Sequence, residues 1–273
     1  MKRIAVLFMA ACCFVLPLAA QEDGGFTAMS LNGATGIYVV PTGRVAYAGD
    51  SFGFNVGYHT NVFKPLNGDT DLNHLIQANV GFLKMFEVSA AYELQPKDYM
   101  GSNPNDFLSG FKFQLPFGSV PIALGASIQY RNIGRSGGHW AAQIYGAVTY
   151  AAEIFDWPAE TTLSMGHTFI EDNNSSDIDF GMGFDLVILP QYLKSFLHGL
   201  IDYANYSYSA DPWGADAWHR GVLNLGVRAD LSRIPALDKF TFAVDLFVAD
   251  AFDSNKNGQG RSVGTGVTFG MSF

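Results

Sequence analysis

Apolar and polar side chains alternate residue by residue over most of this chain. The last segment shows the pattern clearly: every second residue from Val263 to Phe273 is valine, threonine, methionine or phenylalanine, and those between are glycine, threonine or serine. A period of two residues indicates a β-strand with one apolar face. The same alternation recurs in segments 52–58, 76–82, 86–94, 107–115, 122–130, 140–150, 161–169, 178–188, 197–203, 223–229 and 240–248. It predicts about twelve strands, an even count as in closed antiparallel barrels, with about fourteen as the alternative.

The connections between these strands fall into two classes that alternate along the chain. Long polar connections lie at 60–73, 95–105, 132–137, 171–176, 209–217 and 252–260, and the others at 83–85, 116–120, 151–159, 189–194 and 232–238. Outer-membrane barrels have long extracellular loops and short periplasmic turns. Because backbone groups in hydrocarbon need partners within the protein, a span built of strands must be a closed barrel. We therefore expect a single transmembrane antiparallel β-barrel over residues 51–273, with its long loops outside the cell.

A soluble β-sandwich would alternate in the same way, so the position of the aromatic residues matters. They gather near the ends of the predicted strands, with Tyr58, Tyr92 and Tyr130 towards the long loops and Phe82 and Tyr150 towards the short turns. Aromatic girdles of this kind mark the two interfaces of a membrane barrel. This distribution favours the barrel over the sandwich.

The N-terminus predicts export from the cytoplasm. Lys2 and Arg3 precede an apolar stretch, and small residues end at Ala20, so we interpret residues 1–20 as a signal peptide. Residues 9–12 are also similar to a lipobox, which leaves acylation of Cys12 as an alternative. Cys12 and Cys13 are the two cysteines of the chain, so its mature part would contain no disulfide and no thiolate metal site. Residues 21–50 are expected to form a periplasmic or plug segment ahead of the barrel.

The inward face of the predicted strands is polar and mixed in sign. The charged residues that we select from it as candidates to line the lumen are Glu87, Glu93, Lys112, Arg131, Asp179, Asp185, Asp202, Arg220, Arg228 and Asp245. Such groups either form a hydrogen-bonded network that fills a barrel or line a narrow passage for solutes, and the pattern fits both. Carboxylates outnumber cations in the set, which favours cations over polyanionic sugars in any passage. The whole chain has 16 basic and 25 acidic residues, and this acidic balance argues against nucleic acid as a partner.

Two features of the sequence suggest chemistry but have simpler interpretations. Asp253 to Gly258 is similar to the first half of a calcium-binding EF-hand loop, but Gly264 stands where that loop has its glutamate, which favours a plain hairpin loop. Barrel phospholipases use a Ser–His pair on the lipid-facing wall, and His167 does face outward in this register. Ser109 falls on a strand several places away and Ser164 faces inward, so the sequence supports no such pair. We therefore predict no catalytic, cofactor or metal site and no enzyme.

Two resemblances bear on function. The C-terminal strand, with Phe269, Met271 and Phe273 on its apolar face, resembles the sorting strand that the barrel-assembly machinery recognises in outer-membrane proteins. The N-terminal stretch resembles the opening of the YjbH family of outer-membrane proteins, which is associated with exopolysaccharide production, at Gly36, Ile37, Pro41, Thr42, Gly43, Arg44 and Gly49. A plug and a strand capping the periplasmic mouth would both suit this stretch, with Arg44 reaching luminal carboxylates.

The expected function is a narrow channel or passive transport pore for small solutes in the outer membrane of a diderm bacterium. The family resemblance implies an alternative, an accessory or structural barrel in exopolysaccharide export or envelope organisation, and an outer-membrane lipid hydrolase is a third candidate. The expected partners are outer-membrane lipids, periplasmic chaperones, the barrel-assembly machinery and a small solute.

Overall fold

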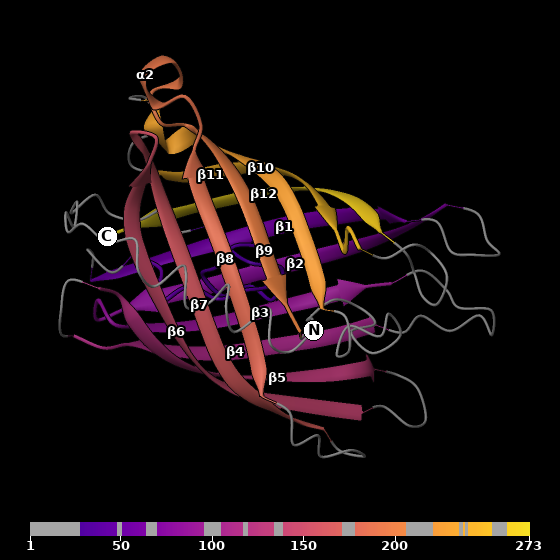
Figure 1. Ribbon diagram of the computed structural model, residues 1–273. Coiled ribbons are helices and arrows are strands. Elements are labelled where there is room, and N and C mark those ends of the chain that lie inside the picture. The colour runs from indigo at the N-terminus through magenta and orange to yellow at the C-terminus, as the bar shows by residue number, and fades with distance from the viewer. Residues whose placement is uncertain are drawn as a thin grey trace, which may run out of the picture.

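The computed structural model describes residues 28–47, 51–63, 70–95, 105–116, 120–133, 139–170, 178–205, 221–234, 237, 240–252 and 261–273. Within these residues twelve strands form one closed barrel (Figure 1). The strands are β1 (Phe52–Phe63), β2 (Asp71–Phe82), β3 (Phe86–Leu94), β4 (Asn105–Gln114), β5 (Ile122–Ile133), β6 (His139–Ile154), β7 (Trp157–Ile170), β8 (Asp179–Val187), β9 (Leu197–Ala204), β10 (Val222–Asp230), β11 (Phe240–Ala249) and β12 (Ser262–Ser272). Two short helical turns, α2 (Pro190–Leu193) and η1 (Leu231–Arg233), lie between strands. Neither is long and apolar enough to cross a membrane as a helix.

Each strand pairs antiparallel with its neighbours in the sequence, and the first strand pairs with the last. The β1–β12 seam brings Phe54 opposite Met271 and Val56 opposite Phe269. All other pairs are simple hairpin neighbours, from β1–β2 around to β11–β12. The predicted fold class, an all-β closed antiparallel barrel with twelve rather than fourteen strands, is confirmed.

Two turns at one end of the barrel, β2–β3 and β6–β7, are tight. Leu83 and Lys84 both have positive φ angles, 53° and 64°, and so do Phe155 and Asp156, at 53° and 63°. Two such residues in succession favour the tight hairpin turn whose twist matches that of the flanking strands.

The predicted connection at 151–159 is wrong, because β6 continues to Ile154 and β7 begins at Trp157. Its backbone pairs run on through Ala151 and Glu160 to Ile154 and Trp157. The error came from relying on side-chain alternation, which weakens in this stretch although the backbone pairing does not.

Burial follows the predicted two-residue register along the strands. Ile76, Ile144 and Leu246 on the outward face are 54%, 61% and 56% exposed, whereas the neighbouring inward side chains Gln77 and Asp245 are 2% and 0% exposed. Aromatic rings pair on the outer surface at the end of the barrel where these turns lie, as in Phe86 with Phe113, Phe240 with Phe269 and Phe52 with Phe273. Apolar groups therefore face the surroundings and polar groups face the interior, the reverse of a water-soluble protein.

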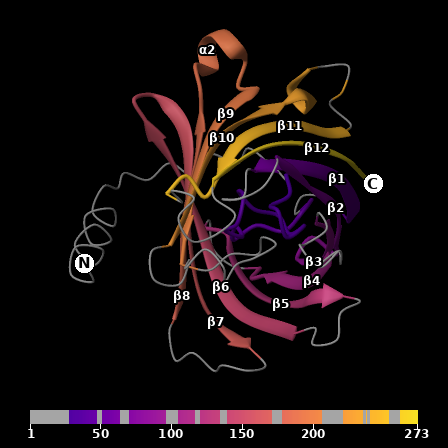
Figure 2. The same cartoon turned by 90° about the vertical axis from the view of Figure 1, so that its right-hand side faces the viewer.

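Residues 28–47, here called the plug segment, lie inside the barrel and pair with no wall strand (Figure 2). Two backbone bridges, Met29 with Thr35 and Gly36 with Pro41, fold this segment into small loops. Its apolar side chains meet inward apolar residues of the wall in two buried clusters. One contains Val39, Val40, Ala91, Leu108 and Ala204, and the other contains Leu31, Ile37, Tyr38, Leu75, Leu200 and Phe247. The core of this protein is thus the lumen itself, filled by the N-terminal part of the chain.

Candidate functional site: the plugged lumen

Asp202 on β9 binds three successive backbone N–H groups of the plug segment. Its Oδ2 accepts hydrogen bonds from the N–H of Tyr38 at 2.9 Å, of Val39 at 2.6 Å and of Val40 at 3.0 Å. Its Oδ1 accepts a fourth from Nδ2 of Asn224 on β10, at 2.6 Å. The carboxylate is fully buried, so these donors replace the water that it would otherwise bind. Hydrogen bonds to a charged group contribute about 1.5–3 kcal/mol each, which makes Asp202 a principal anchor of the plug.

Glu87 on β3 forms a second anchor on another part of the wall. It accepts hydrogen bonds from the backbone N–H of Thr35 (2.8 Å), the hydroxyl of Thr35 (2.5 Å) and the backbone N–H of Ala46 (2.7 Å). Lys112 on β4 lies 3.4 Å from Glu87 and donates to the carbonyl oxygen of Thr35 at 2.8 Å. Both charged side chains are 1% exposed. The two partners of this cross-strand ion pair therefore bind the backbone N–H and the backbone C=O of Thr35.

A third group of contacts surrounds Arg228 on β10. Its Nε donates to Oδ1 of Asp245 on β11 at 2.6 Å, and its Nη2 lies 3.4 Å from the carbonyl oxygens of Met29 and Ile37. The guanidinium also lies 5.9 Å from the centre of the Tyr38 ring, within the range of a cation–π contact. Arg228 and Asp245 are 2% and 0% exposed, so each depends on the other for compensation of its charge.

Arg44 is the only charged residue of the plug segment. Its Nη2 lies 2.6 Å from Oε1 of Glu160 on β7. The structure thus pairs Arg44 with a luminal carboxylate, as the sequence led us to expect. Glu160 itself was missed because the expected connection ended just before it, although the inward alternation of Thr162 and Ser164 extends back to this position.

Uncharged wall side chains complete the ring of contacts. Gln77 and Asn79 on β2 donate to the carbonyl oxygens of Ser30 and Gly33 at 2.8 and 3.1 Å. Further around the wall, Gln114 on β4 accepts from the N–H of Val45, and Thr149 on β6 accepts from the N–H of Gly43. Hydrogen bonds between wall side chains and the plug backbone therefore hold the plug on several strands of the wall.

Glycine residues allow the plug to approach the wall closely. Gly33 has φ +85°, and a Cβ built on it would lie 2.6 Å from the carbonyl oxygen of Ala90. A Cβ on Gly43 would collide with the backbone of Pro121 and Thr149. Inward wall glycines make room in the same way at Gly53, Gly57, Gly81, Gly183 and Gly226, which face Tyr47, Met29, Ala46, Ile37 and Tyr38. Glycine at an inward position was a signal in the sequence that polar patterning alone overlooks.

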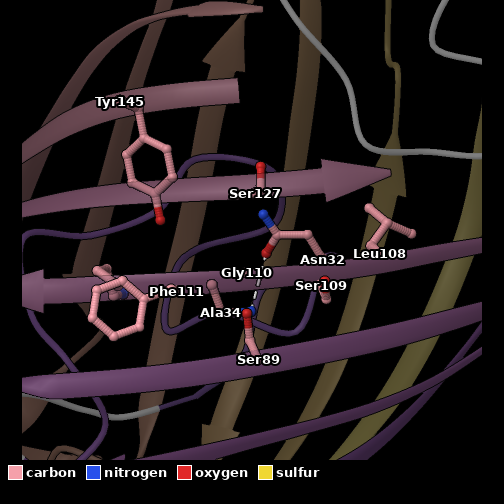
Figure 3. A pocket seen from close by; sticks show the side chains of 10 residues that line it. Asn32, Ala34, Ser89, Leu108, Ser109, Gly110, Phe111, Ser127 and Tyr145 are labelled. Carbon is pink, nitrogen blue, oxygen red and sulfur yellow. Dashed lines mark hydrogen bonds between the residues drawn. The ribbon is translucent and has the colours of Figure 1, made fainter. Parts of the chain in front are cut away.

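Two small cavities border the plug. One cavity, of about 10 Å³, lies between the plug residues Asn32 and Ala34 and the inner wall beside Ser89 and Tyr145 (Figure 3). A second, of about 20 Å³, lies between Arg44, Glu160, Asp185 and Arg228. Because a water molecule needs roughly 10–15 Å³ measured in this way, each has room for only one or two waters. At these places the plug leaves no passage for a solute.

The remaining lumen candidates occupy different places. Asp185 on β8 lies 2.7 Å from Nδ1 of His198 on β9. Glu93 and Asp179 lie on the half of the wall away from the tight turns, where Glu93 accepts a hydrogen bond from Asn73 (2.9 Å) and Asp179 accepts one from Gln143 (2.6 Å). Arg220 and the side chain of Arg131 lie outside the described residues. The structure thus gathers Glu87, Lys112, Asp202, Arg228 and Asp245 around the plug and places Glu93 and Asp179 nearer the other end of their strands.

The proposed assembly residues lie on the outward face of β12 and just after it. Phe269 and Phe273 are exposed, and the N–H of Phe273 donates to the carbonyl oxygen of Phe52 at 2.8 Å. Met271 lies opposite Phe54 at the seam and opposite Phe240 on the other side. Their recognition by assembly machinery stays a prediction.

A closed barrel with an apolar exterior and a polar interior decides the structural class. The fold is that of an outer-membrane β-barrel. No protein-family model and no curated protein matches the chain. Among solved structures it is similar to the KdgM porin in complex with disordered oligogalacturonate, with 11% identity and a TM-score of 0.48 over 80% of this chain and 99% of that one. Omp33 of Acinetobacter baumannii is similar at 13% identity and a TM-score of 0.47, over 81% of this chain and 98% of that one.

The outer membrane phospholipase A of Escherichia coli is also similar, with 10% identity and a TM-score of 0.38 over 81% of this chain and 96% of that one. Porins and a hydrolase both appear, so the likeness is one of fold. In this chain Ser109 on β4 and His167 on β7 are separated by β5 and β6, and the ring of His167 packs against Phe169 at 4.6 Å. The described part of the chain brings together no group of three potential metal ligands. Asp253 to Gly258, the EF-hand-like stretch, lies outside the residues that the structure describes.

Proposed function

We propose that this chain is an outer-membrane pore for small solutes that its own plug segment keeps closed. One observation carries the proposal: the wall closes without the plug. Every strand pairs with two neighbours, including β1 with β12. The backbone–backbone hydrogen bonds of the plug run within it, as from Leu31 to Tyr38 and from Ile37 to Val40. Withdrawal of residues 28–47 would therefore leave the strand pairing of the wall intact.

The size of the barrel supports a narrow passage. Barrels of about 8 strands fill with their own side chains, and those of about 16–18 leave an aqueous channel. Twelve strands lie between these limits, and here a separate segment takes up the interior. Without that segment the lumen would be polar, hydrated and wide enough for small solutes. The proposal places the barrel among the lipids of the outer membrane of a diderm bacterium, after delivery by periplasmic chaperones to the barrel-assembly machinery.

Conductance in planar lipid bilayers tests this function. Gly33→Val with Gly43→Val adds side chains where the plug meets wall backbone, so it should expel the plug without altering any charge or any strand. Gly146→Val is the matched control, because a Cβ at this outward position would meet its nearest atom at an ordinary 3.7 Å. We expect steady single-channel currents from the double variant, and rare openings from the wild type and the control.

A reversible lock strengthens the test. A Cβ built on Gly183 would lie 3.4 Å from Cγ1 of Ile37, close to the reach of a disulfide, and the mature chain is predicted to contain no other thiol. Ile37→Cys with Gly183→Cys in the chain that keeps Gly33 and Gly43 should abolish even the rare openings when oxidised and restore them on reduction. Correctly folded release variants that stay silent under reducing conditions would refute the pore.

The filled lumen also supports a second candidate, an accessory barrel in exopolysaccharide export or envelope organisation. The residues from Gly36 to Arg44 that resemble the opening of the YjbH family lie within the plug, in contact with the wall at Asp202 and Glu160. In that case the plug would be a permanent part of the structure. Release variants would then fold poorly or remain silent, and the export of polysaccharide from cells carrying them would fall.

A further inference from the structure

The plug segment touches the wall where a permeating solute would have to pass, and it does so mainly as a donor of hydrogen bonds and positive charge. We infer that the open pore selects cationic solutes, such as organic amines, and that Asp202 and Glu160 are its specificity residues. This inference rests on the proposed function, since it describes the lumen after the plug has left.

Asp202 is the first of the two sites. The plug satisfies its charge with three backbone N–H groups, and among the described wall residues its hydrogen-bond donor is the amide of Asn224. When residues 38–40 withdraw, no cationic side chain of the wall takes their place in these contacts. The carboxylate then faces water with one neutral donor, and an ammonium or guanidinium group supplies the N–H donors that it has lost.

Glu160 is the second site. Arg44 of the plug binds it at 2.6 Å and is the single formal charge that the plug brings into the lumen. The plug thus places a guanidinium on this wall carboxylate, which is the interaction that a cationic solute would make there. Loss of the plug removes this cation and leaves the wall charge uncompensated.

The other charged wall residues around the plug do not neutralise Asp202 and Glu160 after the plug has left. Glu87 keeps Lys112 at 3.4 Å and Asp245 keeps Arg228 at 2.6 Å, so these two pairs stay neutral. Among the described residues around the plug, Asp185, Asp202 and Glu160 remain, with His198 at 2.7 Å from Asp185. In a narrow lumen with a low-dielectric wall, the negative electrostatic potential of these carboxylates is strengthened. Cations are therefore concentrated in the lumen and polyanions are repelled.

Reversal potentials in a KCl gradient test the inference on the variant Gly33→Val with Gly43→Val, whose wall charges are those of the wild type. We expect a permeability ratio that favours K⁺ over Cl⁻ several-fold, and a current that micromolar spermidine reduces while citrate does not. Adding Asp202→Asn and Glu160→Gln should bring the ratio near unity and remove the spermidine effect. Lys112 and Arg228 are left unchanged, and heat-modifiable migration on gels confirms that each variant has folded.

The possible outcomes separate the two proposals. Folded release variants that carry no current refute the pore, and the selectivity falls with it. Currents that are unselective or favour Cl⁻ leave the pore standing and overturn the inference. Cation selectivity that survives both substitutions overturns the assignment to Asp202 and Glu160.

Discussion

The depth of the apolar belt can be tested with one charged side chain at two heights on the outer wall. Leu246 lies on the outward face of β11 and is 56% exposed. It is between one and two residues from the middle of the strand Phe240–Ala249. At about 3.3 Å per residue and a tilt of about 40°, that places it roughly 4 Å from the midplane. Arginine at the midplane of a barrel wall costs about 2–4 kcal/mol, so Leu246→Arg should shift the folding equilibrium about 30- to 800-fold towards the unfolded state.

Val263 is the matched control on the neighbouring strand. It is also outward and 51% exposed, but it is the second residue of β12 (Ser262–Ser272), about four residues from the middle. That distance corresponds to roughly 10 Å of depth, close to the edge of a belt about 25 Å tall, where arginine costs about 0–1 kcal/mol. Urea titrations of refolding into lipid vesicles, followed by tryptophan fluorescence, measure both costs. Equal costs, or a larger cost at Val263, would show that the belt is not centred on the strands as the structure places it.

Asp245, the inward neighbour of Leu246, shows what the lumen adds to this argument. The alternation alone suggests that Asp245→Arg would be tolerated in a polar lumen. The structure instead buries Asp245 against Arg228 at 2.6 Å, with His59 at 3.4 Å on its other oxygen. Arginine there would place two guanidinium groups together without water. Removing one partner of a buried pair costs about 3–5 kcal/mol, so we now expect this variant to be strongly destabilised as well.

Two further predictions concern topology and assembly. Thiol reagents applied to intact cells should label single cysteines at Asn67, Asn103, Asn174, Gly214 and Asn257, which we expect outside, and should not label Ser119 or Ala236; labelling of Ala236 but not Asn257 would reverse the orientation. Deleting Phe273 or changing it to Asp should leave the chain unfolded in the periplasm, because the predicted sorting strand loses its terminal aromatic residue, and heat-modifiable migration should disappear. Normal insertion of both Phe273 variants would mean that this strand is not the assembly signal.

The register of the wall could be predicted because each strand faces two contrasting environments. A slip of one residue would turn Leu246 inward and Asp245 outward, so a two-residue period fixes every position at once. The same rule failed at Ala151 to Ile154, where the backbone pairs continue although the apolar alternation does not. Polar inward positions were likewise predictable, and Asp202 and Glu87 are examples.

The partners of these inward groups could not be predicted from the same pattern. Alternation shows that Asp202 faces inward, but its donors Tyr38, Val39 and Val40 lie 162 to 164 positions away in the sequence. The choice between a plug and a strand capping the mouth depended on contacts of this range. Inward apolar residues such as Phe247, which stacks on Tyr38 at 4.8 Å, are interruptions of the polar pattern and would have indicated a filled interior.

The order of the chain gives the plug a consequence for biogenesis. Residues 28–47 are synthesised before every strand, yet they bind side chains from β1 to β11, including Arg228, which lies 199 positions after Met29. The seam between β1 and β12 then closes around them. A segment enclosed in this way has to be gathered into the nascent sheet before the last strand docks, or else be threaded through a finished ring. We therefore expect loss of the contacts to Glu87 or Asp202 to lower the rate of barrel closure before it lowers the final stability of the barrel.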